Sequence, residues 1–429
     1  MIEYAKLQLG CLIVVCYIAF VYFSESRRTK HKYTYSFYDL ILIVTIFTLI
    51  MDGATAIMVN HLDTVSRDIL DISHMFFYLG IDAFIFCIFL YLLQITEHFP
   101  ESKNGKIALL FPFVVNVLVV VCTVDDIIYI ENPISNYSMG FAAVACYAMA
   151  FAYVILSFIT FVRRQQYIER HKRAAILLYM LTLVFTCAYQ IAVPESLVTA
   201  IAYTVIVIGM YVNQQNPALK ELDHYHKEMV MGFATLVEQR DDSTGGHIRR
   251  TSTYAEMLAK ELQSQGYYKD VLTKDYIKNL VLAAPMHDVG KIAVPDDVLQ
   301  KPGRLTADEF TIMKSHAVHG GAIILDTFGN LDNEDYVDMA YQVAYYHHEK
   351  WNGGGYPEGI KGEDIPLCAR IMAIVDVFDA VSEKRCYRDA MPLEQCFVII
   401  EEGKGVHFDP VIADVFLSMR AKVEAVHNA

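Results

Sequence analysis

The sequence lacks the motifs of several large enzyme classes. It contains no G-x-S-x-G nucleophile elbow, no phosphate-binding P-loop and no G-x-G-x-x-G dinucleotide fingerprint. It has nine cysteines but no C-x-x-C pair, and six of the nine lie in apolar runs, so they are best interpreted as small buried hydrophobes rather than disulfides or zinc ligands. The net charge of −14 argues against a partner such as duplex DNA or RNA, which requires a basic patch.

What the sequence has in abundance is apolar residues. They make up 55% of 429 positions, and the mean hydropathy of +0.31 is too high for an ordinary soluble protein of this size. The excess lies in residues 1–213, where runs of roughly 20 apolar residues, the length needed to cross a bilayer, alternate with short polar breaks. We therefore predict a transmembrane sensory region with seven helices. The runs are 7–23, 38–59, 69–96, 107–129, 139–162, 173–192 and 195–212. Because further spans follow the first run, we interpret it as a span and not as a cleaved signal peptide.

Basic residues in the short connections predict the orientation. The first, third and fifth connections together hold eleven lysines and arginines, whereas the opposite side offers only Lys6 and Arg67. Since cytoplasmic loops carry the positive excess, this bias places the N-terminus outside the cell and everything after about residue 213 in the cytoplasm.

Four ionisable residues interrupt the second and third apolar runs: Asp52, Asp71, His74 and Asp82. Charged groups are costly in lipid and usually face the interior of a helix bundle. One interpretation is an outward-facing sensory pocket. The other is a structural set of paired side chains, or residues near the headgroups.

The composition changes after residue 213, where a linker or signalling helix at 214–232 is expected to restart near Ala218 after Pro217. Five apolar residues fall near heptad spacing on this helix: Leu219, Leu222, Met229, Phe233 and Leu236. Fewer than three clean heptads leave two alternatives open. The stripe is either the seam of a homodimer or part of the first core helix of the following domain.

Residues 233–429 predict an all-helical cytoplasmic domain, so the whole chain is expected to be all-α. No alternating strand pattern recurs, and no βαβ unit is present. The expected helices are 247–262, 276–288, 306–326, 333–348, 367–383, 391–403 and 410–425. Thr306 and Glu309 have the spacing of a capping box at the start of one of them.

Potential metal ligands recur through this helical domain. The adjacent His287-Asp288 pair is accompanied by five others: His247, His316, His347, His348 and Asp376. Asp376 lies in the apolar run AIVDVFDAV, where an unpaired buried carboxylate would be costly and a metal ion would remove that cost. Seven imidazole and carboxylate ligands suit two first-row metal ions, which can together activate a water as hydroxide and hold a phosphodiester oxygen.

Two further features accompany the ligands. Lys291 follows His287 by four residues and Asp288 by three, so a helical turn would place its ammonium where it could neutralise a substrate phosphate. The glycines Gly353–Gly355 come directly after the His347-His348 doublet. They could let a substrate approach closely, or they could simply form a turn.

Residues from about 230 to 425 resemble the HD-GYP family, a branch of the HD phosphohydrolase superfamily. The resemblance rests on RDDSTGGHIRRT, HDVGKIAVPDDVLQKPGRL, MKSHAVHG, HHEKWNGGGYPEGIKGEDIPLCARI, VDVFDAVSEKRCYRDA and HFDPVI. The name-giving triplet is Gly355-Tyr356-Pro357. Such domains are all-helical and, where active, hydrolyse cyclic di-GMP with iron or manganese. The resemblance implies a phosphodiesterase of a bacterial inner membrane that produces linear pGpG or GMP.

The family's site residues carry over to matching positions. The resemblance implies that one metal is held by His247, His287 and Asp376, that Asp288 bridges, and that the other is held by His316, His347 and His348. Lys291 would lie near the scissile phosphate. Six positions would contact the substrate beside it: Gly353, the triplet Gly355-Tyr356-Pro357, and the two arginines Arg385 and Arg388.

Three questions stay open at this point. Some family members recruit a third metal with a glutamate four residues before the first histidine, where this chain has Ser243, which favours two metals although Asp242 lies next to it. The substrate could be another cyclic dinucleotide, such as cyclic GMP-AMP. The domain could also be a non-catalytic signalling module, although such a module has little need for seven ligands.

Overall fold

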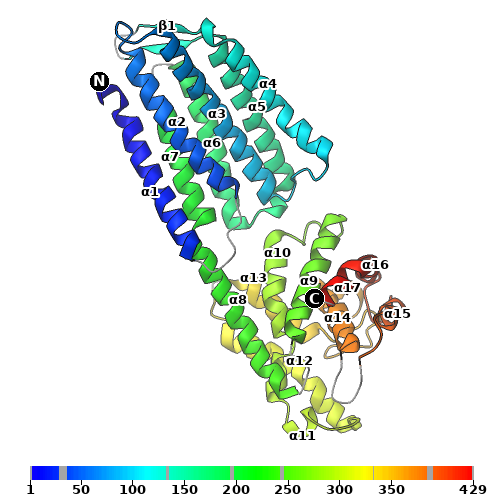
Figure 1. Cartoon of the computed structure of the whole chain (residues 1–429). Coiled ribbons are helices and arrows are strands. Elements are labelled where there is room, and N and C mark those ends of the chain that lie inside the picture. Colours follow the sequence, from blue (N-terminus) through cyan, green and yellow to red (C-terminus); the bar gives the residue numbers. More distant parts are fainter. Residues whose placement is uncertain are drawn as a thin grey trace. The chain divides into compact units, whose positions relative to one another are not determined.

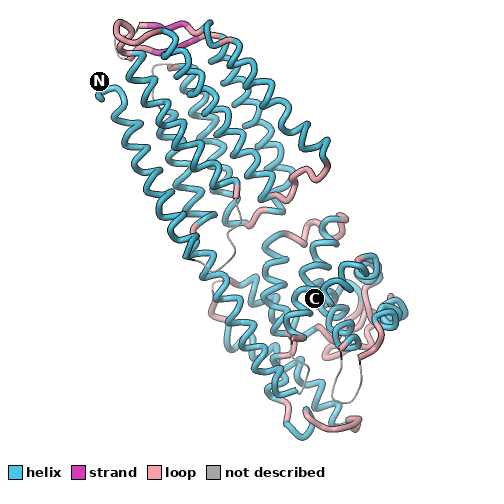
Figure 2. The backbone as a smooth tube through the Cα atoms, in the orientation of Figure 1, coloured by secondary structure: helices cyan, strands magenta, loops and turns pink. Residues whose placement is uncertain are grey.

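The chain folds as two compact units, Met1–Glu221 and Leu222–Ala429, which are described separately. The structure is a computed structural model that describes residues 2–28, 36–131, 135–193, 198–241, 246–331, 333–383 and 390–427. Helices dominate both units (Figures 1 and 2).

The first unit is a bundle of helices that lie roughly alongside one another (Figure 1). They are α1 (Lys6–Arg28), α2 (Phe37–Val59), α3 (Arg67–Ile95), α4 (Lys103–Cys122), α5 (Phe141–Arg164), α6 (Arg170–Ala192) and α7 (Val198–Met210). Among the described residues, six of these helices are long and apolar enough to cross a membrane. The apolar helical stretch of the seventh, Val198–Asn213, is shorter, so a seventh span stays a prediction.

A β-hairpin in the connection between α4 and α5 corrects the all-α prediction (Figure 2). Strand β1 (Ile128–Ile130) pairs antiparallel with β2 (Tyr137–Met139), with Tyr129 opposite Ser138. The expected helix over 107–129 ends earlier, at Cys122. Three-residue strands are too short to produce a detectable alternation, so the apolar residues of β1 were indistinguishable from the end of a span. The chain is therefore nearly all-α.

The four ionisable residues of α2 and α3 are all buried but differ in their partners. Asp71 accepts a hydrogen bond from the hydroxyl of Tyr129, and Asp82 accepts one from the amide of Asn116. Those two contacts fit a paired structural set. Asp52 Oδ2 has no hydrogen-bond partner, and neither has the second oxygen of Asp82, Oδ1.

The second unit contains helices of 4 to 22 residues, most of them packed around one main apolar core. Helix α8 (Pro217–Glu238) leads into it, and the others follow in chain order: α9 (His247–Ser264), α10 (Lys274–Ala283), α11 (Asp296–Leu299), α12 (Ala307–Phe328), α13 (Glu334–Tyr346), α14 (Leu367–Ser382), α15 (Leu393–Gly403), α16 (Pro410–Ser418) and α17 (Arg420–His427). Phe378 of α14 is fully buried, with its ring centroid 5.7 Å from that of Tyr254 on α9 and 5.1 Å from that of Phe416 on α16. This aromatic cluster packs α9 against α14, the helices that carry His247 and Asp376 of the site described below.

Most of the helices predicted for this unit are present. The capping box is confirmed, since Thr306 accepts a hydrogen bond from the Glu309 amide and the Glu309 side chain accepts one from the Thr306 amide. Two predictions need correction. The helix expected over 276–288 ends at Ala283 and continues as 3₁₀ turns, and the last expected helix is broken near Met419 into α16 and α17.

The apolar stripe of α8 does not pack into this core. Leu222, Met229 and Leu236, spaced by seven residues, are each more than half exposed, whereas Val230 and Ala234 on another face are buried in the core. Helix α8 therefore packs into the core through one face only. The described residues of this unit do not cover the apolar stripe on its other face.

Candidate metal centre

The His287-Asp288 pair lies at a tight turn between two 3₁₀ segments, Ala284–Met286 and Val289–Ala293. Gly290 allows this turn to press against α12, because a Cβ at Gly290 would lie 2.9 Å from the Cα of Gly320 and still closer to the backbone around it. Only glycine fits such an approach. The turn therefore brings Asp288 next to His316, which α12 carries one turn before Gly320.

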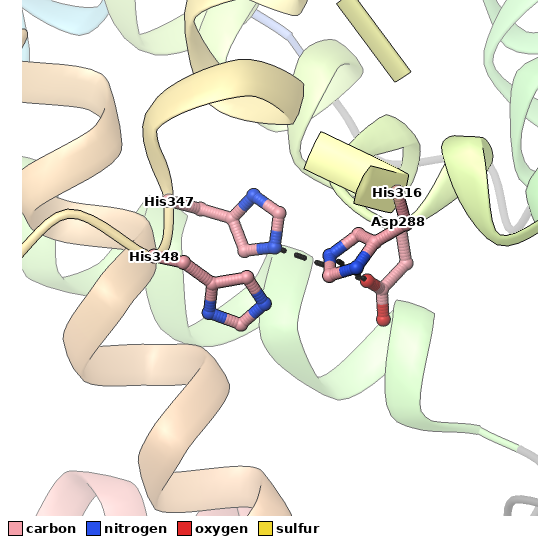
Figure 3. Close-up of side chains that lie close together, drawn as sticks. All are labelled: Asp288, His316, His347 and His348. Carbon is pink, nitrogen blue, oxygen red and sulfur yellow. Dashed lines mark ion pairs between the residues drawn. The ribbon is translucent and has the colours of Figure 1, made fainter. Parts of the chain in front are cut away.

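The structure gathers all seven predicted ligands into two groups. Within each group, one ligand atom from every residue lies within 4.8 Å of the others, and the groups are Asp288, His316, His347 and His348, and His247, His287 and Asp376. In Figure 3 the imidazoles of the first group converge on the Asp288 carboxylate from two separate parts of the chain. His287, His316 and His347 are at most 2% exposed, so these imidazoles are shielded from bulk solvent.

Asp288 presents one oxygen to each group. Its Oδ1 is 3.4 Å from His316 Nε2 and 3.8 Å from His347 Nε2. Its Oδ2 is 3.3 Å from His287 Nε2, in the other group. Within that other group, Asp376 Oδ1 lies 3.6 Å from His247 Nε2 and 3.7 Å from His287 Nε2. A carboxylate placed in this way can contact two cations at once.

Hydrogen bonds at Nδ1 orient the imidazoles. His287 donates to the carbonyl of Ala284 at 2.9 Å, and His316 donates to that of Met313 at 2.7 Å. His347 Nδ1 likewise lies 3.0 Å from the Val343 carbonyl. When Nδ1 carries the proton, the neutral ring keeps its lone pair on Nε2, the nitrogen that faces the site.

The atoms that converge are therefore acceptors, and this tests whether the site fits a metal. The Nε2 atoms of His316 and His347 are buried and have no hydrogen-bond partner. His247 Nε2 and His287 Nε2 lie 3.2 Å apart, although both rings donate through Nδ1. Buried lone pairs that face one another are costly unless they share a cation. The donor set of imidazole and carboxylate suits a first-row divalent ion.

Asp379 supports His247 from behind, and the sequence analysis missed it. It is 1% exposed, accepts a hydrogen bond from His247 Nδ1 at 2.8 Å, and binds Arg250 Nε at 2.6 Å and Nη2 at 3.0 Å. Burial would raise the pKa of Asp379, but the bonds to His247 and Arg250 lower it overall. Its position three residues after Asp376 on an apolar helix was the available signal, because that spacing shares a helix face.

Strong charge interactions surround Asp288. Burial would raise the pKa of its carboxyl group, but the ammonium of Lys291, 2.9 Å from Oδ2, and the imidazole of His287 hold it well below the usual value. Burial would likewise lower the pKa of His287, yet the carboxylates of Asp288 and Asp376 outweigh it and raise that pKa to about 9. The two carboxylates therefore attract a proton to His287, and a metal ion binding there would displace it.

The glycine-rich loop after the histidine doublet borders the site. Gly355 lies so close to the preceding turn that a Cβ would be 2.6 Å from the His348 carbonyl oxygen. Tyr356 follows, with its ring centroid 4.7 Å from that of His348. The buried Glu349 accepts backbone hydrogen bonds from Glu358 at 2.7 Å and from Gly359 at 2.9 Å, which fixes the far end of the loop. The triplet of Gly355, Tyr356 and Pro357 thus borders the site next to His348.

Glu238 is a second residue that the sequence analysis missed. Its side chain is 9% exposed, its Oε1 has no hydrogen-bond partner, and it lines a cavity of about 20 Å³ shared with His247, His287 and Asp288. That volume is about the size needed for one water molecule.

Four residues named from the sequence lie outside the described residues: Asp242, Ser243, Arg385 and Arg388.

Comparison with known proteins agrees with this geometry. Residues 233–412 match a family model described as HD domain. A protein of Vibrio cholerae named "Probable cyclic di-GMP phosphodiesterase" is 45% identical over 199 residues, which are 46% of this chain and 45% of that protein. A Thermotoga maritima protein named "Cyclic di-GMP phosphodiesterase" is 34% identical over 208 residues, 48% of this chain and 53% of that protein.

The relatives do not all share one substrate name. Another Vibrio cholerae protein, "3'3'-cGAMP-specific phosphodiesterase 2", is 41% identical over 197 residues, 46% of this chain and 35% of that protein. The chain thus spans about half or less of the length of these relatives. In each case the match covers about half of this chain.

Proposed function

We propose that the second unit is an HD-GYP phosphodiesterase that hydrolyses cyclic di-GMP to linear pGpG, or further to GMP. The observation that carries the proposal is the position of Asp288, whose two oxygens face two separate groups of buried imidazoles. Such a bridge is what a two-metal hydrolytic site requires. The names of the relatives support the substrate.

In this proposal His247, His287 and Asp376 hold one divalent ion, His316, His347 and His348 hold the other, and Asp288 contacts both. Iron and manganese fit the donor set, as the resemblance implies. When bound, the ions polarise a phosphoryl oxygen and lower the pKa of water to near neutrality. The protein contributes the orientation, since backbone carbonyls and Asp379 hold the imidazoles with Nε2 toward the site.

Lys291 supplies a fixed positive charge beside the reacting phosphodiester. Its Nζ lies 2.9 Å from Asp288 Oδ2, so it stays within reach of a phosphate that approaches the bridging carboxylate. Charge that develops on the phosphoryl oxygens in the transition state is stabilised by such a preorganised cation. Gly353 and the triplet of Gly355, Tyr356 and Pro357 would border the substrate, and Arg385 and Arg388 would contact its phosphates.

A panel of substrates tests the proposal. The full chain in detergent, loaded with manganese or ferrous iron, is expected to hydrolyse cyclic di-GMP to pGpG faster than 3'3'-cyclic GMP-AMP. Cyclic GMP-AMP is the second candidate because three of the relatives are named for it. Faster turnover of cyclic GMP-AMP would reverse the substrate order. No turnover of either dinucleotide, with both metals bound, would instead favour a non-catalytic signalling module.

We also propose that the first unit spans the inner membrane of a bacterium, with the N-terminus outside and the second unit in the cytoplasm. The six apolar helices support the membrane assignment. The orientation rests on the lysines and arginines of the first, third and fifth connections.

The uncovered stripe of α8 supports a homodimer. Leu222, Met229 and Leu236 repeat at heptad spacing and are more than half exposed, as expected for residues that pack against the same helix of a second copy. Replacing Met229 and Leu236 with lysine should convert a dimer to a monomer in light scattering of the full chain. Val398→Lys, at an exposed apolar residue of α15, is the control and should leave the mass unchanged. A monomeric wild type, or a dimer that survives both substitutions, would contradict the seam.

A further inference from the structure

The first unit contains a cavity of about 430 Å³ between its helices and the β-hairpin. Its walls come from distant parts of the chain, with Asp52 on α2, His74 on α3, Tyr147 on α5 and Gln190 on α6. Ser138 of β2 lies at the hairpin end. The volume falls in the range of small-molecule pockets.

Most of the wall is apolar and much of it aromatic. Five phenylalanine and tyrosine rings line it: Phe77, Tyr78, Tyr137, Tyr147 and Phe151. Tyr78 is 2% exposed and its hydroxyl hydrogen-bonds to Ser138 Oγ at 2.8 Å, so that ring is fixed by the hairpin. Aromatic faces carry negative charge density and attract cations that come within about 6 Å of the ring centroid.

Two polar side chains of this wall, Asp52 and His74, have atoms that can accept a hydrogen bond from a ligand. Asp52 is 3% exposed, lines the cavity, and has no hydrogen-bond partner for Oδ2. His74 lies 3.1 Å from the carbonyl of Leu70 through Nδ1, so in the neutral ring Nε2 is an acceptor. No lysine or arginine is among the described residues of this wall.

A buried carboxylate oxygen without a hydrogen-bond partner is costly, and the carboxylate of Asp52 lines this cavity, with the side chain of Gln8 also near it. Its two companions on α3 differ, because Asp71 is bonded to Tyr129, Asp82 is bonded to Asn116, and neither lines the cavity. Asp82 also has one oxygen, Oδ1, without a hydrogen-bond partner, so what sets Asp52 apart is that its carboxylate lines the cavity.

We propose that this cavity is a binding site for a small amphipathic amine. The ammonium group would pair with Asp52 Oδ2 and donate toward His74, while an aromatic or aliphatic body would lie against Tyr147, Phe151 and Phe77. A carboxylate-bearing ligand is disfavoured, because Asp52 would repel it and no cation lines the wall. Small amphipathic amines would then be the chemical class of signal that the first unit senses.

Matched probes test the proposal on the full chain in detergent micelles. Tryptamine, indole-3-acetate and 3-ethylindole share one ring system and differ in the charge of the side arm, as do 2-phenylethylamine, phenylacetate and ethylbenzene. Equilibrium dialysis with labelled probes is expected to show saturable binding of the amines, about tenfold or more tighter than that of the acid and neutral analogues.

Two variants distinguish this site from partition into the micelle. Asp52→Asn should weaken amine binding about tenfold or more, whereas Asp82→Asn, a buried aspartate outside the cavity, should leave it unchanged. Ala143→Phe keeps the carboxylate but fills the cavity, so it should also remove binding, and it serves if Asp52→Asn does not fold.

The proposal is overturned if amine, acid and neutral probes bind alike, if none binds, or if Asp52→Asn leaves amine binding intact. Native mass spectrometry adds an independent outcome. A phospholipid that stays bound in both the wild type and Asp52→Asn, and that no amine displaces, would show that the cavity holds an acyl chain. Because every readout is binding to the membrane unit, failure here leaves the proposed phosphodiesterase untouched.

Discussion

Replacing His287 and Asp288 together with alanine is expected to abolish hydrolysis of cyclic di-GMP while the full chain is still expressed in the membrane. The double change removes one proposed metal ligand and the carboxylate oriented toward both groups. Two-metal centres contribute several kcal/mol of charge stabilisation, so the rate should fall by about a thousandfold or more. Turnover by purified protein and its metal content by elemental analysis measure the two consequences.

A graded series makes this test specific. His319→Ala alters an exposed histidine one turn from His316 and should leave both turnover and metal content unchanged. Asp379→Asn removes the negative charge that supports His247 and pairs with Arg250, and the loss of such a partner of a metal-binding histidine costs about 10–100-fold in metal affinity. Excess metal should therefore restore activity to Asp379→Asn but not to the double variant. Full turnover by the double variant would refute the assignment of the site.

The seven residues of the candidate metal centre could be selected from the sequence because packing alone does not require a histidine or an aspartate at these positions. A histidine doublet at the end of a helix, or Asp376 inside an apolar run, stands out without knowledge of the fold. The sequence did not show which further residues lie next to these seven in the fold. Asp379 looks like any helical aspartate until the fold brings it to His247, 132 residues away in the chain. Glu238 is similar, since only the fold places it against His247 and Asp288.

Prediction from the sequence met the same limit in the first unit. The apolar runs predicted its helices well, because length and hydropathy are local properties. The sequence could not distinguish Asp52 from Asp71 and Asp82, because whether a buried carboxylate is paired depends on residues such as Tyr129 and Asn116 in other elements. The hairpin was missed for a different reason. Its strands of three residues are shorter than any pattern that can be detected.

Replacing Lys291 with methionine should separate catalysis from metal binding. Methionine keeps most of the length and the apolar stem but removes the charge that lies 2.9 Å from Asp288 Oδ2. Because a cation is not a metal ligand and repels other cations, its loss should leave the metal content unchanged. The charge that develops in the transition state then lacks its partner, and kcat should fall by about 10²–10³-fold.

The comparison of kcat with KM decides whether Lys291 acts on the reacting phosphate. If it only attracted substrate, KM would rise and kcat would stay constant, since ground state and transition state would lose the same interaction. Lys260→Met, at an exposed lysine of α9 paired with Glu256, is the matched control and should change neither parameter. Arginine at position 291 should restore part of kcat, because it returns the positive charge with a different geometry. A Lys291→Met enzyme with normal kcat would show that the reaction does not depend on the positive charge of Lys291.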